Sequence, residues 1–477
     1  MRRLAGEDAG FLLMELPVQP MNTQGLAIVR PAVGPDGVPV PLTPSDLHRH
    51  VTRRLGELPS FRWRVVPVPF GVGQPVYVED PQFDVTDHLR HVTLPHPGGS
   101  AQLDALFAAL GEHPLDRRHP LWQLVLVDGL ADGRQAVIVR YNHCMADGVA
   151  AVTTFSRLCT GADHVPDPPA EPWQGEPIPT RSRLVAGALV DHARRLRALP
   201  LLAAETWRAA RAARAAAPGT VPDVPADTPA CILNDAFTVA RSYGRARLPM
   251  DRVRMVKEAA GVRVNDVALA VVGGALRRYL ADTGELPDRP LTASVPVAFE
   301  PAGAAPRQWG NRFSALTTSL ATDVADPWQR LARIGATTRA AKERFALARG
   351  DLMPDWLEYV PPFVAGPAVR ALHRAMAEGR RKPDVNVLVS NIRGPDERWS
   401  FHTAVVEELY LSGPPSNGVG LNVMIWSYAG DLVFSVLSFA DALRRPAALE
   451  EALVAALDEL VASVPRKPVN RRDGPTS

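Results

Sequence analysis

The chain has 477 residues, of which 46% are hydrophobic and 22% charged. This is the ordinary mixture of a globular protein, and the length is sufficient for two domains. The 53 basic and 51 acidic residues leave a net charge of +2, and no basic stripe alternates with aromatic residues, so nucleic-acid binding is not indicated.

Cysteine usage and the N-terminus both fit the cytoplasm. The N-terminal Met1-Arg2-Arg3 leads into Glu7 and Asp8, without the apolar core or cleavage site of a signal peptide. No apolar run approaches the ~18 residues that span a bilayer. The cysteines form no CxxC or zinc pattern, and their odd number argues against a disulfide framework; they are Cys144, Cys159 and Cys231.

The first part of the chain predicts mixed α/β structure. Apolar residues at helical spacing follow Ser100, which is a candidate cap for a helix. Residues 121–127 and 136–141 are strand candidates separated by turn residues, so a hairpin is expected. A helix rich in Ala and Val should follow Asp147-Gly148.

Two proline-rich connectors, 161–180 and 218–229, flank a segment with eight arginines against two acidic residues. Pro200 should divide this segment into two helices. We favour a connecting helix pair whose Leu and Ala faces pack on the rest of the protein. Trp207 among the arginines supports the alternative, a segment that lies on an anionic membrane or lipid-droplet surface.

The remainder of the chain is again mixed α/β. A helix is expected over 265–280 and a strand over 291–297, and an apolar strand over 385–389 should run into Ser390-Asn391. Residues 420–428 and 432–439 indicate a second hairpin. The basic, proline-containing tail after Val464 should be frayed. Two α/β halves of similar size suggest a pseudo-duplicated architecture.

Residues 142–148, with the sequence NHCMADG, carry the pattern HxxxDG where an apolar strand ends and a helix begins. A His there can project into a cleft, and its pKa near neutrality suits it to take a proton from a hydroxyl, thiol or amine. Gly148 allows a close backbone approach. The alternative is a buried structural His143, with Asp147 as the cap of the following helix.

Further short motifs accompany HxxxDG along residues 1–460. They resemble those of the bacterial wax ester synthase/diacylglycerol acyltransferase family, whose HHxxxDG, PLW and ND motifs match the residues here. The matching segments are Met1 to Leu4 with Asp8, Phe11-Leu12 and Glu15; Gln19-Pro20-Met21; Phe61 to Arg64; Val78 to Pro81; Phe83-Asp84; Leu115 to Arg117; Pro120-Leu121-Trp122; Asn265-Asp266-Val267; Gly310-Asn311-Arg312; Ser390-Asn391; Gly394-Pro395; and Gly418 to Asn422.

The resemblance implies an α/β fold of two chloramphenicol-acetyltransferase-like lobes, each a mixed sheet flanked by helices, with the active-site channel between them. We place the first lobe at 1–165, the helical linker at 166–232, the second lobe at 233–464 and a basic tail at 465–477. The resemblance also implies an O-acyltransferase of the cytoplasm, peripheral to the inner membrane or lipid droplets if the arginine-rich segment binds lipid. Acyl-CoA would be the donor and a long-chain alcohol or diacylglycerol the acceptor, without a metal or bound cofactor.

The chain departs from the family pattern at three places. Asn142 replaces the first His of HHxxxDG, but the second His is the base in the related superfamily, so His143 should retain that role. Asn22 replaces a His after Pro20-Met21, and residues 233–241 lack the expected motif. An ester- or amide-forming enzyme of specialised metabolism is therefore an alternative. A non-catalytic lobe pair is a third hypothesis, which the intact HxxxDG opposes.

Roles for further residues follow from the resemblance. Asn265 would face the channel and donate to the oxyanion of the thioester, although it or Asp266 could simply cap the helix. Asp147 would bind an arginine elsewhere rather than move the proton.

Four residues are expected to contact substrate: Asn142, Gly148, Ser390 and Asn391. The last two could equally form a plain turn at the end of a strand. Cys144 is a weak candidate nucleophile, because strand alternation points it away from His143.

Overall fold

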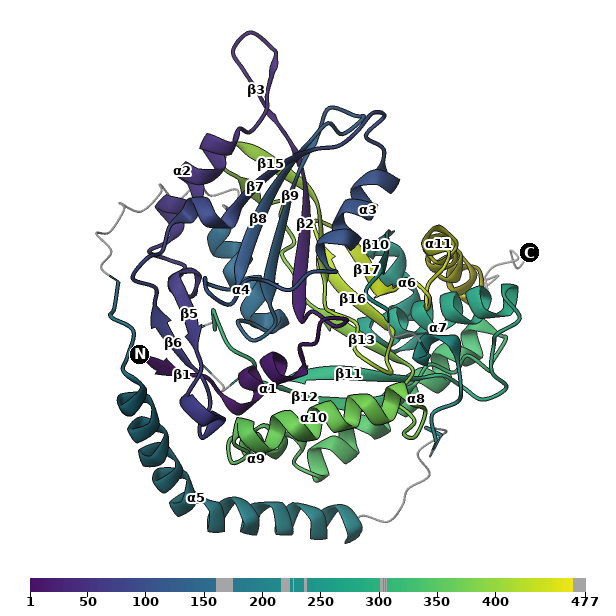
Figure 1. The fold of residues 1–477 in the computed structure, drawn as a ribbon. Coiled ribbons are helices and arrows are strands. Elements are labelled where there is room, and N and C mark those ends of the chain that lie inside the picture. The colour runs from purple at the N-terminus through teal and green to yellow at the C-terminus, as the bar shows by residue number, and fades with distance from the viewer. Residues whose placement is uncertain are drawn as a thin grey trace, which may run out of the picture.

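The computed structural model describes residues 1–159, 175–215, 224–225, 227–235, 238–300, 303, 305 and 307–465. Two six-stranded sheets lie side by side, and helices flank each of them (Figure 1). This arrangement confirms the mixed α/β fold class with two sheet-containing lobes.

The first sheet has the strand order β14-β15-β2-β9-β8-β7. The predicted hairpin is present, because β8 and β9 pair antiparallel, and α4 follows β9 as expected. The strands are β2 Asn22–Arg30, β7 Leu89–Thr93, β8 Trp122–Asp128, β9 Gln135–Asn142, β14 Ser400–Phe401 and β15 Ala404–Ser412; the helices beside them are α2 Pro44–Arg54, α3 Ser100–Leu110 and α4 Gly148–Leu158.

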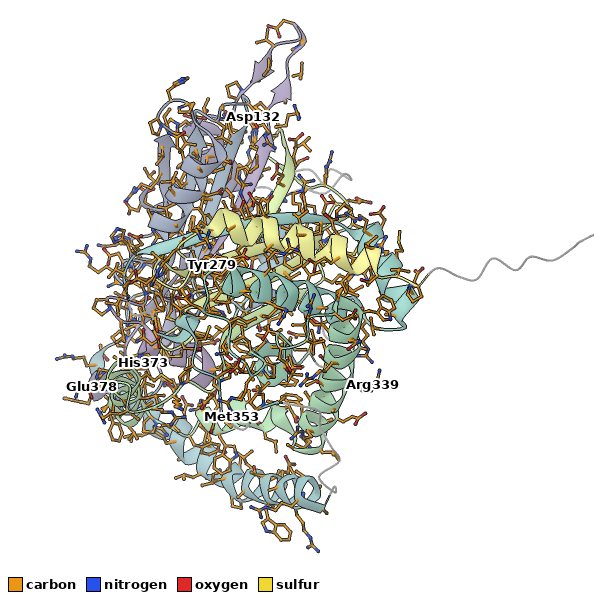
Figure 2. All side chains as sticks on the ribbon, turned by 90° about the vertical axis from the view of Figure 1, so that its right-hand side faces the viewer. Asp132, Tyr279, Arg339, Met353, His373 and Glu378 are labelled. Atoms are coloured by element: carbon orange, nitrogen blue, oxygen red, sulfur yellow. The ribbon has the colours of Figure 1, made fainter. Side chains whose placement is uncertain are left out.

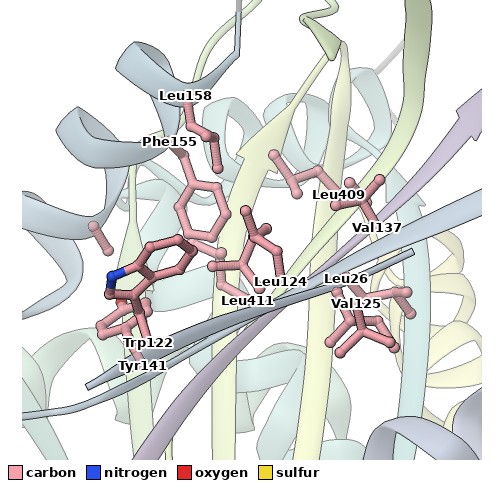
Figure 3. Packing of buried hydrophobic residues seen from close by; sticks show 14 of the residues in the cluster. Leu26, Trp122, Leu124, Val125, Val137, Tyr141, Phe155, Leu158, Leu409 and Leu411 are labelled. Carbon is pink, nitrogen blue, oxygen red and sulfur yellow. The ribbon is translucent and has the colours of Figure 1, made fainter. Parts of the chain in front are cut away.

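Helix α4 lies directly on the first sheet. A Cβ at Gly25 of β2 would come within 2.6 Å of the Phe155 ring, so only glycine lets the helix approach this closely. Figure 3 shows Phe155 and Leu158 pointing from α4 toward Leu411 and Leu124 of the sheet. All eight residues of β9 are buried, as expected for a strand covered on both faces. This packing fixes the end of β9, where HxxxDG begins.

The second sheet has the order β10-β17-β16-β13-β11-β12. Neighbours β11, β13 and β16 run parallel, and β16 and β17 form the predicted antiparallel hairpin. Strand β13 starts two residues later than expected, so Ser390 and Asn391 lie within it. The strands are β10 Arg241–Pro249, β11 Thr292–Ala298, β12 Phe313–Ser319, β13 Val387–Ile392, β16 Leu421–Tyr428 and β17 Asp431–Phe439; the helices are α6 Met250–Ala260, α7 Val264–Asp282, α8 Pro327–Leu347 and α11 Pro446–Ala462.

Helix α7 is the central helix of the second lobe. A Cβ at Gly273 would lie 2.4 Å from the Leu320 carbonyl oxygen, and one at Gly274 would lie 3.1 Å from Ala456 Cβ. The two glycines therefore allow close contact with the neighbouring backbone and with α11. This close contact explains why glycine occurs at both positions, although each glycine within a helix destabilises it by about 1 kcal/mol relative to Ala.

The positions of strands β14 and β15 differ from the predicted division of the chain into two lobes. They lie within residues 233–464, which we assigned to the second lobe, yet β15 pairs antiparallel with β2 and extends the first sheet. The hydrophobic pattern of a strand predicts burial but does not specify which sheet the strand joins. The two lobes are thus interlocked by the chain itself.

The arginine-rich segment forms one helix, α5 Arg181–Ala215, with Pro200 inside it, so the prediction of two helices is wrong. Proline removes one backbone hydrogen bond and tends to kink a helix, and the α5 ribbon bends strongly along its length (Figure 1). Leu184 and Leu202 are buried against the body of the protein. Most of the two connectors and the tail beyond 465 lie outside the described residues.

A few smaller elements complete the fold. Helix α1 packs against α9 and α10. Within the described residues no single helix is long and apolar enough to cross a membrane. In the same residues, α6 and α7 reach the required length and apolar composition only when taken together, and the chain bends by 105° between them. The remaining elements are β1 Arg2–Arg3, β3 Ala32–Val33, β4 Pro39–Val40, β5 Trp63–Val66, β6 Val76–Glu79, α1 Gly6–Met14, α9 Met353–Leu357, α10 Pro362–Ala377 and the short 3-10 helices Pro59–Arg62, Pro69–Gly71, Val85–His88, Ile232–Asn234 and Gly350–Leu352.

Candidate active site

The HxxxDG segment forms a tight turn between β9 and α4. The His143 N–H donates to the Met21 carbonyl at 2.7 Å, which continues the pairing of β9 with β2 for one residue. Asp147 is the N-cap of α4, and its Oδ1 accepts a hydrogen bond from the Ala150 N–H at 3.0 Å. The capping interpretation of Asp147 is therefore correct, and it leaves the second carboxylate oxygen for other partners.

That second oxygen binds the loop that leads into β12 of the second lobe. Asp147 Oδ2 accepts from Arg307 Nη2 at 2.6 Å and from the Arg312 N–H at 2.9 Å. Arg307 is thus the distant arginine that the sequence alone did not identify. In the same loop, the Gly310 N–H donates to the Met145 carbonyl at 2.6 Å, and the Asp147 N–H donates to Gly310 at 3.2 Å. Side-chain and backbone contacts therefore hold the turn against the second lobe.

The imidazole of His143 is held on two sides. Its ring stacks on Phe11 of α1 at 4.0 Å between centroids and 10° between planes. Its Nδ1 lies 3.1 Å from Asn311 Oδ1. The Asn311 Nδ2 donates to the His143 carbonyl and to Asp8 Oδ1, each at 2.8 Å. Because both of those partners can only accept, the amide orientation is determined, and Oδ1 must face the ring.

This orientation fixes the tautomer of the imidazole. An amide oxygen can only accept, so Nδ1 carries the proton and Nε2 keeps its lone pair. Burial lowers the pKa of His143, while its own backbone, Asp147 and the bond to Asn311 act in the opposite direction. The ring is therefore neutral at neutral pH, which is the state that a general base requires.

Helix α1 supplies buried carboxylates beside this arrangement. Asp8 Oδ1 also accepts from the Asn311 N–H at 2.7 Å, and burial raises the pKa of Asp8 to about 6. Burial, and then the neighbouring Asp8, raise the pKa of Glu7 to about 8. Asp8 is thus mostly ionised at neutral pH and can anchor Asn311, whereas Glu7 is mostly protonated.

Asn142 lies beside His143 but binds other groups. Its Nδ2 donates to Glu15 Oε2 at 2.7 Å, and its Oδ1 accepts from the Cys144 N–H at 3.0 Å. The side chain is buried and braces the turn, which is a supporting position rather than one in an open cavity.

Cys144 is fully buried, and this burial raises the pKa of its thiol well above the ordinary range. The neutral thiol is a poor nucleophile, so the structure does not support the Cys nucleophile hypothesis.

Gly148 brings the first lobe against the second. A Cβ there would lie 1.9 Å from Ile392 Cδ1 at the end of β13, so no other residue fits without displacing that side chain. Next to Ile392, the Asn391 Nδ2 donates to Asn265 Oδ1 at 3.2 Å. Asp266 caps α7 by accepting from the Arg263 N–H at 2.9 Å. The capping role therefore belongs to Asp266, and Asn265 remains available for another function.

A cavity of about 590 Å³ opens at this point of the second lobe. Asn265, Asn391 and Ile392 line it, whereas the other three predicted contact residues, Asn142, Gly148 and Ser390, do not. Among the described residues, no group of three or more His, Cys, Asp or Glu side chains could hold a metal ion.

Two family models match this chain. The wax ester synthase/diacylglycerol acyltransferase catalytic domain matches residues 4–268, and the WS/DGAT C-terminal domain matches residues 309–461. The chain belongs to the WS/DGAT family. The first match contains His143, Asp147 and Asn265, and the second contains Asn311, so the site joins the two family domains.

Curated relatives and solved structures agree with this assignment. Two Mycobacterium tuberculosis proteins that carry the name of a diacylglycerol O-acyltransferase are 33% and 32% identical, and the matches span 96% and 97% of this chain and 96% and 98% of theirs. The WS/DGAT structure from Marinobacter aquaeolei VT8 is 26% identical with a TM-score of 0.69, covering 97% of this chain and all of that one. The first condensation domain of the CDA synthetase, 17% identical with a TM-score of 0.58 and 97% of each chain covered, shares the two-lobed fold.

The residues that position His143 were only partly visible in the WS/DGAT sequence motifs. Asp8, Phe11 and Asn311 all occur in the motifs that carry the resemblance, but their spacing gives no indication that they meet. Arg307 belongs to none of those motifs. In the structure, Asp8 and Asn311 form a chain of hydrogen bonds that ends at Nδ1 of His143.

We predict that Asn311→Ala lowers kcat roughly 10- to 100-fold, the range typical of a group that orients a functional imidazole. Asn311 raises the pKa of His143, so its loss lowers that pKa. The rate increases as the base loses its proton, and the acidic limb of the pH–rate profile should therefore move to lower pH.

The matched control is Asn234→Ala, which removes a similarly buried amide with two backbone acceptors in the second lobe. It should lower Tm without moving the acidic limb. If Asn311→Ala changes neither kcat nor the acidic limb of the pH–rate profile, Asn311 does not position His143.

Proposed function

We propose that this chain is an O-acyltransferase that moves a fatty acyl group from acyl-CoA to the hydroxyl of a long-chain alcohol or diacylglycerol, forming wax ester or triacylglycerol. The observation that carries the proposal is the neutral imidazole of His143 in a chain of this family. Its Nδ1 is bonded to Asn311, and its Nε2 has no hydrogen-bond partner among the residues that the structure describes. Acyl-CoA enters as a substrate, and no bound cofactor is needed.

In the proposed reaction, His143 Nε2 removes the hydroxyl proton while the oxygen attacks the thioester carbonyl. The carbon–oxygen bond forms and the carbonyl oxygen becomes an oxyanion. When this intermediate collapses, the carbon–sulfur bond breaks, and the imidazolium returns its proton to the departing CoA thiolate. Asp147 takes no proton in this scheme, since its two oxygens are bound to Ala150, Arg307 and Arg312.

Asn265 is the proposed oxyanion donor. Its Oδ1 is bound to Asn391, while its Nδ2 has no partner among the described residues and can donate to a substrate in the cavity that it lines. A donor aimed at a developing oxyanion acts mainly in the transition state.

A second candidate is ester or amide formation with a different acceptor in specialised metabolism. The replacement of the first His of the family motif by Asn142 favours it.

One assay tests both candidate functions. Purified protein is incubated with palmitoyl-CoA and either hexadecanol or diolein, and free thiol is measured. Turnover with neither acceptor, together with turnover on another hydroxyl or amine, would favour this second candidate.

We predict that His143→Gln lowers kcat by about 10²–10⁴, the usual value of general-base assistance, with little change in Tm. The control is Asn142→His, which restores the family's His pair on the neighbouring residue and should change the rate by less than about tenfold. Thiol release measures both. Turnover by His143→Gln near the wild-type rate would disprove the mechanism. A rate for Asn142→His that exceeds the wild-type rate by orders of magnitude would show that the wild-type chain is not a competent enzyme.

We predict that Asn265→Ala lowers kcat more than it raises KM, because the lost donor stabilises the transition state. Loss of one oxyanion donor typically costs about 10²–10³ in kcat. Asn391→Ala should have a smaller effect, since Asn391 would act on the oxyanion through its bond to Asn265. A change confined to KM would assign Asn265 to substrate binding instead.

We also propose that α5 contacts an anionic lipid surface, where the water-insoluble acceptor resides. Several of its apolar side chains are exposed beside its arginines, and Arg211 lies over the Trp207 ring. Such a mixture of basic and apolar groups is typical of a helix at a membrane interface. The exposed residues are Leu189, Val190, Leu196, Leu201 and Trp207.

The lipid contact predicts that the protein floats with phosphatidylglycerol vesicles, less so with phosphatidylcholine vesicles, and less in high salt. The double variant Leu196→Glu/Trp207→Glu should abolish flotation while leaving Tm unchanged. The control is Val454→Glu, which adds a charge at an exposed apolar position of α11. Equal loss in the control, or no flotation of the wild type, would contradict a role of α5.

A further inference from the structure

The cavity of about 590 Å³ lies outside the carboxyl ends of three neighbouring parallel strands, β11, β13 and β16. Open α/β sheets characteristically bind ligands at this edge, and the volume is typical of a ligand site. The cavity also includes the first turn of α7. Its lining residues are Met250, Arg254, Val264, Asn265, Val295 to Val297, Leu316, Thr338, Lys342, Asn391 to Arg393, Asp396, Ser427 and Gly430 to Leu432.

The charges around the cavity do not balance. Its two acidic residues are already paired, Asp396 with Arg393 at 3.3 Å and Asp431 with Arg247 at 2.5 Å. Arg254 of α6 and Lys342 of α8 have no ion pair or hydrogen bond from their side chains to any other described residue. Two cations on different helices therefore border one cavity without a compensating anion.

The lining of the cavity combines charged, apolar and amide side chains. Most of the other lining side chains are apolar, and the amides of Asn265 and Asn391 lie where the cavity reaches Ile392 and hence Gly148 of the HxxxDG segment. A ligand that fits this lining carries phosphates for the two cations, a less polar chain for the apolar residues and a carbonyl for the amides.

We propose that Arg254 and Lys342 bind the phosphates of the CoA portion of the donor, and that its pantetheine arm runs through the cavity so that the thioester reaches Asn265. This assignment rests on the proposed acyl-CoA-dependent function and names the residues that select the donor. Both cations are donors for charge-assisted hydrogen bonds to phosphate. Neither side chain is hydrogen-bonded to His143 or Asn265 in the described part of the chain, so their contribution should appear in binding rather than in the chemical step.

The experiment compares two donors that differ in their phosphates. The full-length wild type and Arg254→Ala/Lys342→Ala are assayed with decanoyl-CoA and with S-decanoyl-N-acetylcysteamine, which has the same thioester and no phosphate. We expect the double variant to raise KM for decanoyl-CoA at least tenfold, with kcat within about twofold, because uniform binding energy is lost. KM for the truncated donor should not change.

The matched control is Arg339→Ala. Arg339 lies on α8 three residues before Lys342, is exposed at the surface in Figure 2, and does not line the cavity. Its removal changes the net charge of the same helix and should leave KM for both donors unaltered. An equal rise of KM in this control would mean that general charge attraction, and not the cavity, recognises the donor.

Direct binding separates this proposal from the proposed function. CoA is titrated calorimetrically into His143→Gln with and without the two substitutions, and Kd should rise at least tenfold when Arg254 and Lys342 are absent. If the wild type turns over neither donor, the proposed function fails, while the titration still tests the site. Equal Kd values, or an equal loss of activity with both donors, would overturn the assignment of the phosphates to these two cations.

Discussion

The candidate active site depends on the carboxylate of Asp147, which binds groups from both lobes at once. One oxygen caps α4 of the first lobe, and the other accepts from Arg307 and from the backbone of Arg312 in the second. The carboxylate is buried, so losing a partner would leave an uncompensated charge at a cost of about 3–5 kcal/mol. The same loop carries Asn311, and the contact that holds the turn therefore also brings the partner of His143 into place.

The electrostatics of the site follow from the burial of acidic groups beside one arginine. Glu7, Asp8 and Asp147 are all buried near Arg307, which cannot neutralise three carboxylates. Burial, and then the charge of Asp8, raise the pKa of Glu7 to about 8, so Glu7 is mostly protonated at neutral pH and does not add to the negative charge. Asp8 keeps its charge and binds Asn311 twice. A neutral amide lies between Asp8 and His143, so the carboxylate does not bind Nδ1 directly and does not strongly raise the pKa of the proposed base.

Sequence reasoning succeeded where the information is local. The hairpin at β8 and β9, the helix after Gly148, the helix beginning near Asn265 and the HxxxDG turn all follow from patterns within about 20 residues. The pairing of β15 with β2 joins segments nearly 400 residues apart, and the bond between Asp8 and Asn311 spans 303 residues. No periodicity encodes such contacts. Pro200 bends the helix without dividing it, because packing of nearby residues such as Leu202 keeps the chain helical despite the lost hydrogen bond.

The interlocked sheets explain how a site with parts from two lobes stays in register. His143 comes from the first lobe, yet its tautomer is set by Asn311 and its proposed oxyanion donor is Asn265, both from the second. A hinge between the lobes would separate these groups, and a misplacement of about 1 Å is enough to cost a large factor in rate. Strand β15 returns from the second half of the chain to pair with β2, and β2 pairs with β9. The strand that ends one residue before His143 is therefore bound to the second half of the chain through the backbone. Gly148 against Ile392 adds a contact that leaves no space for sliding. The two lobes therefore provide the two halves of the site, and the exchanged strand keeps them aligned.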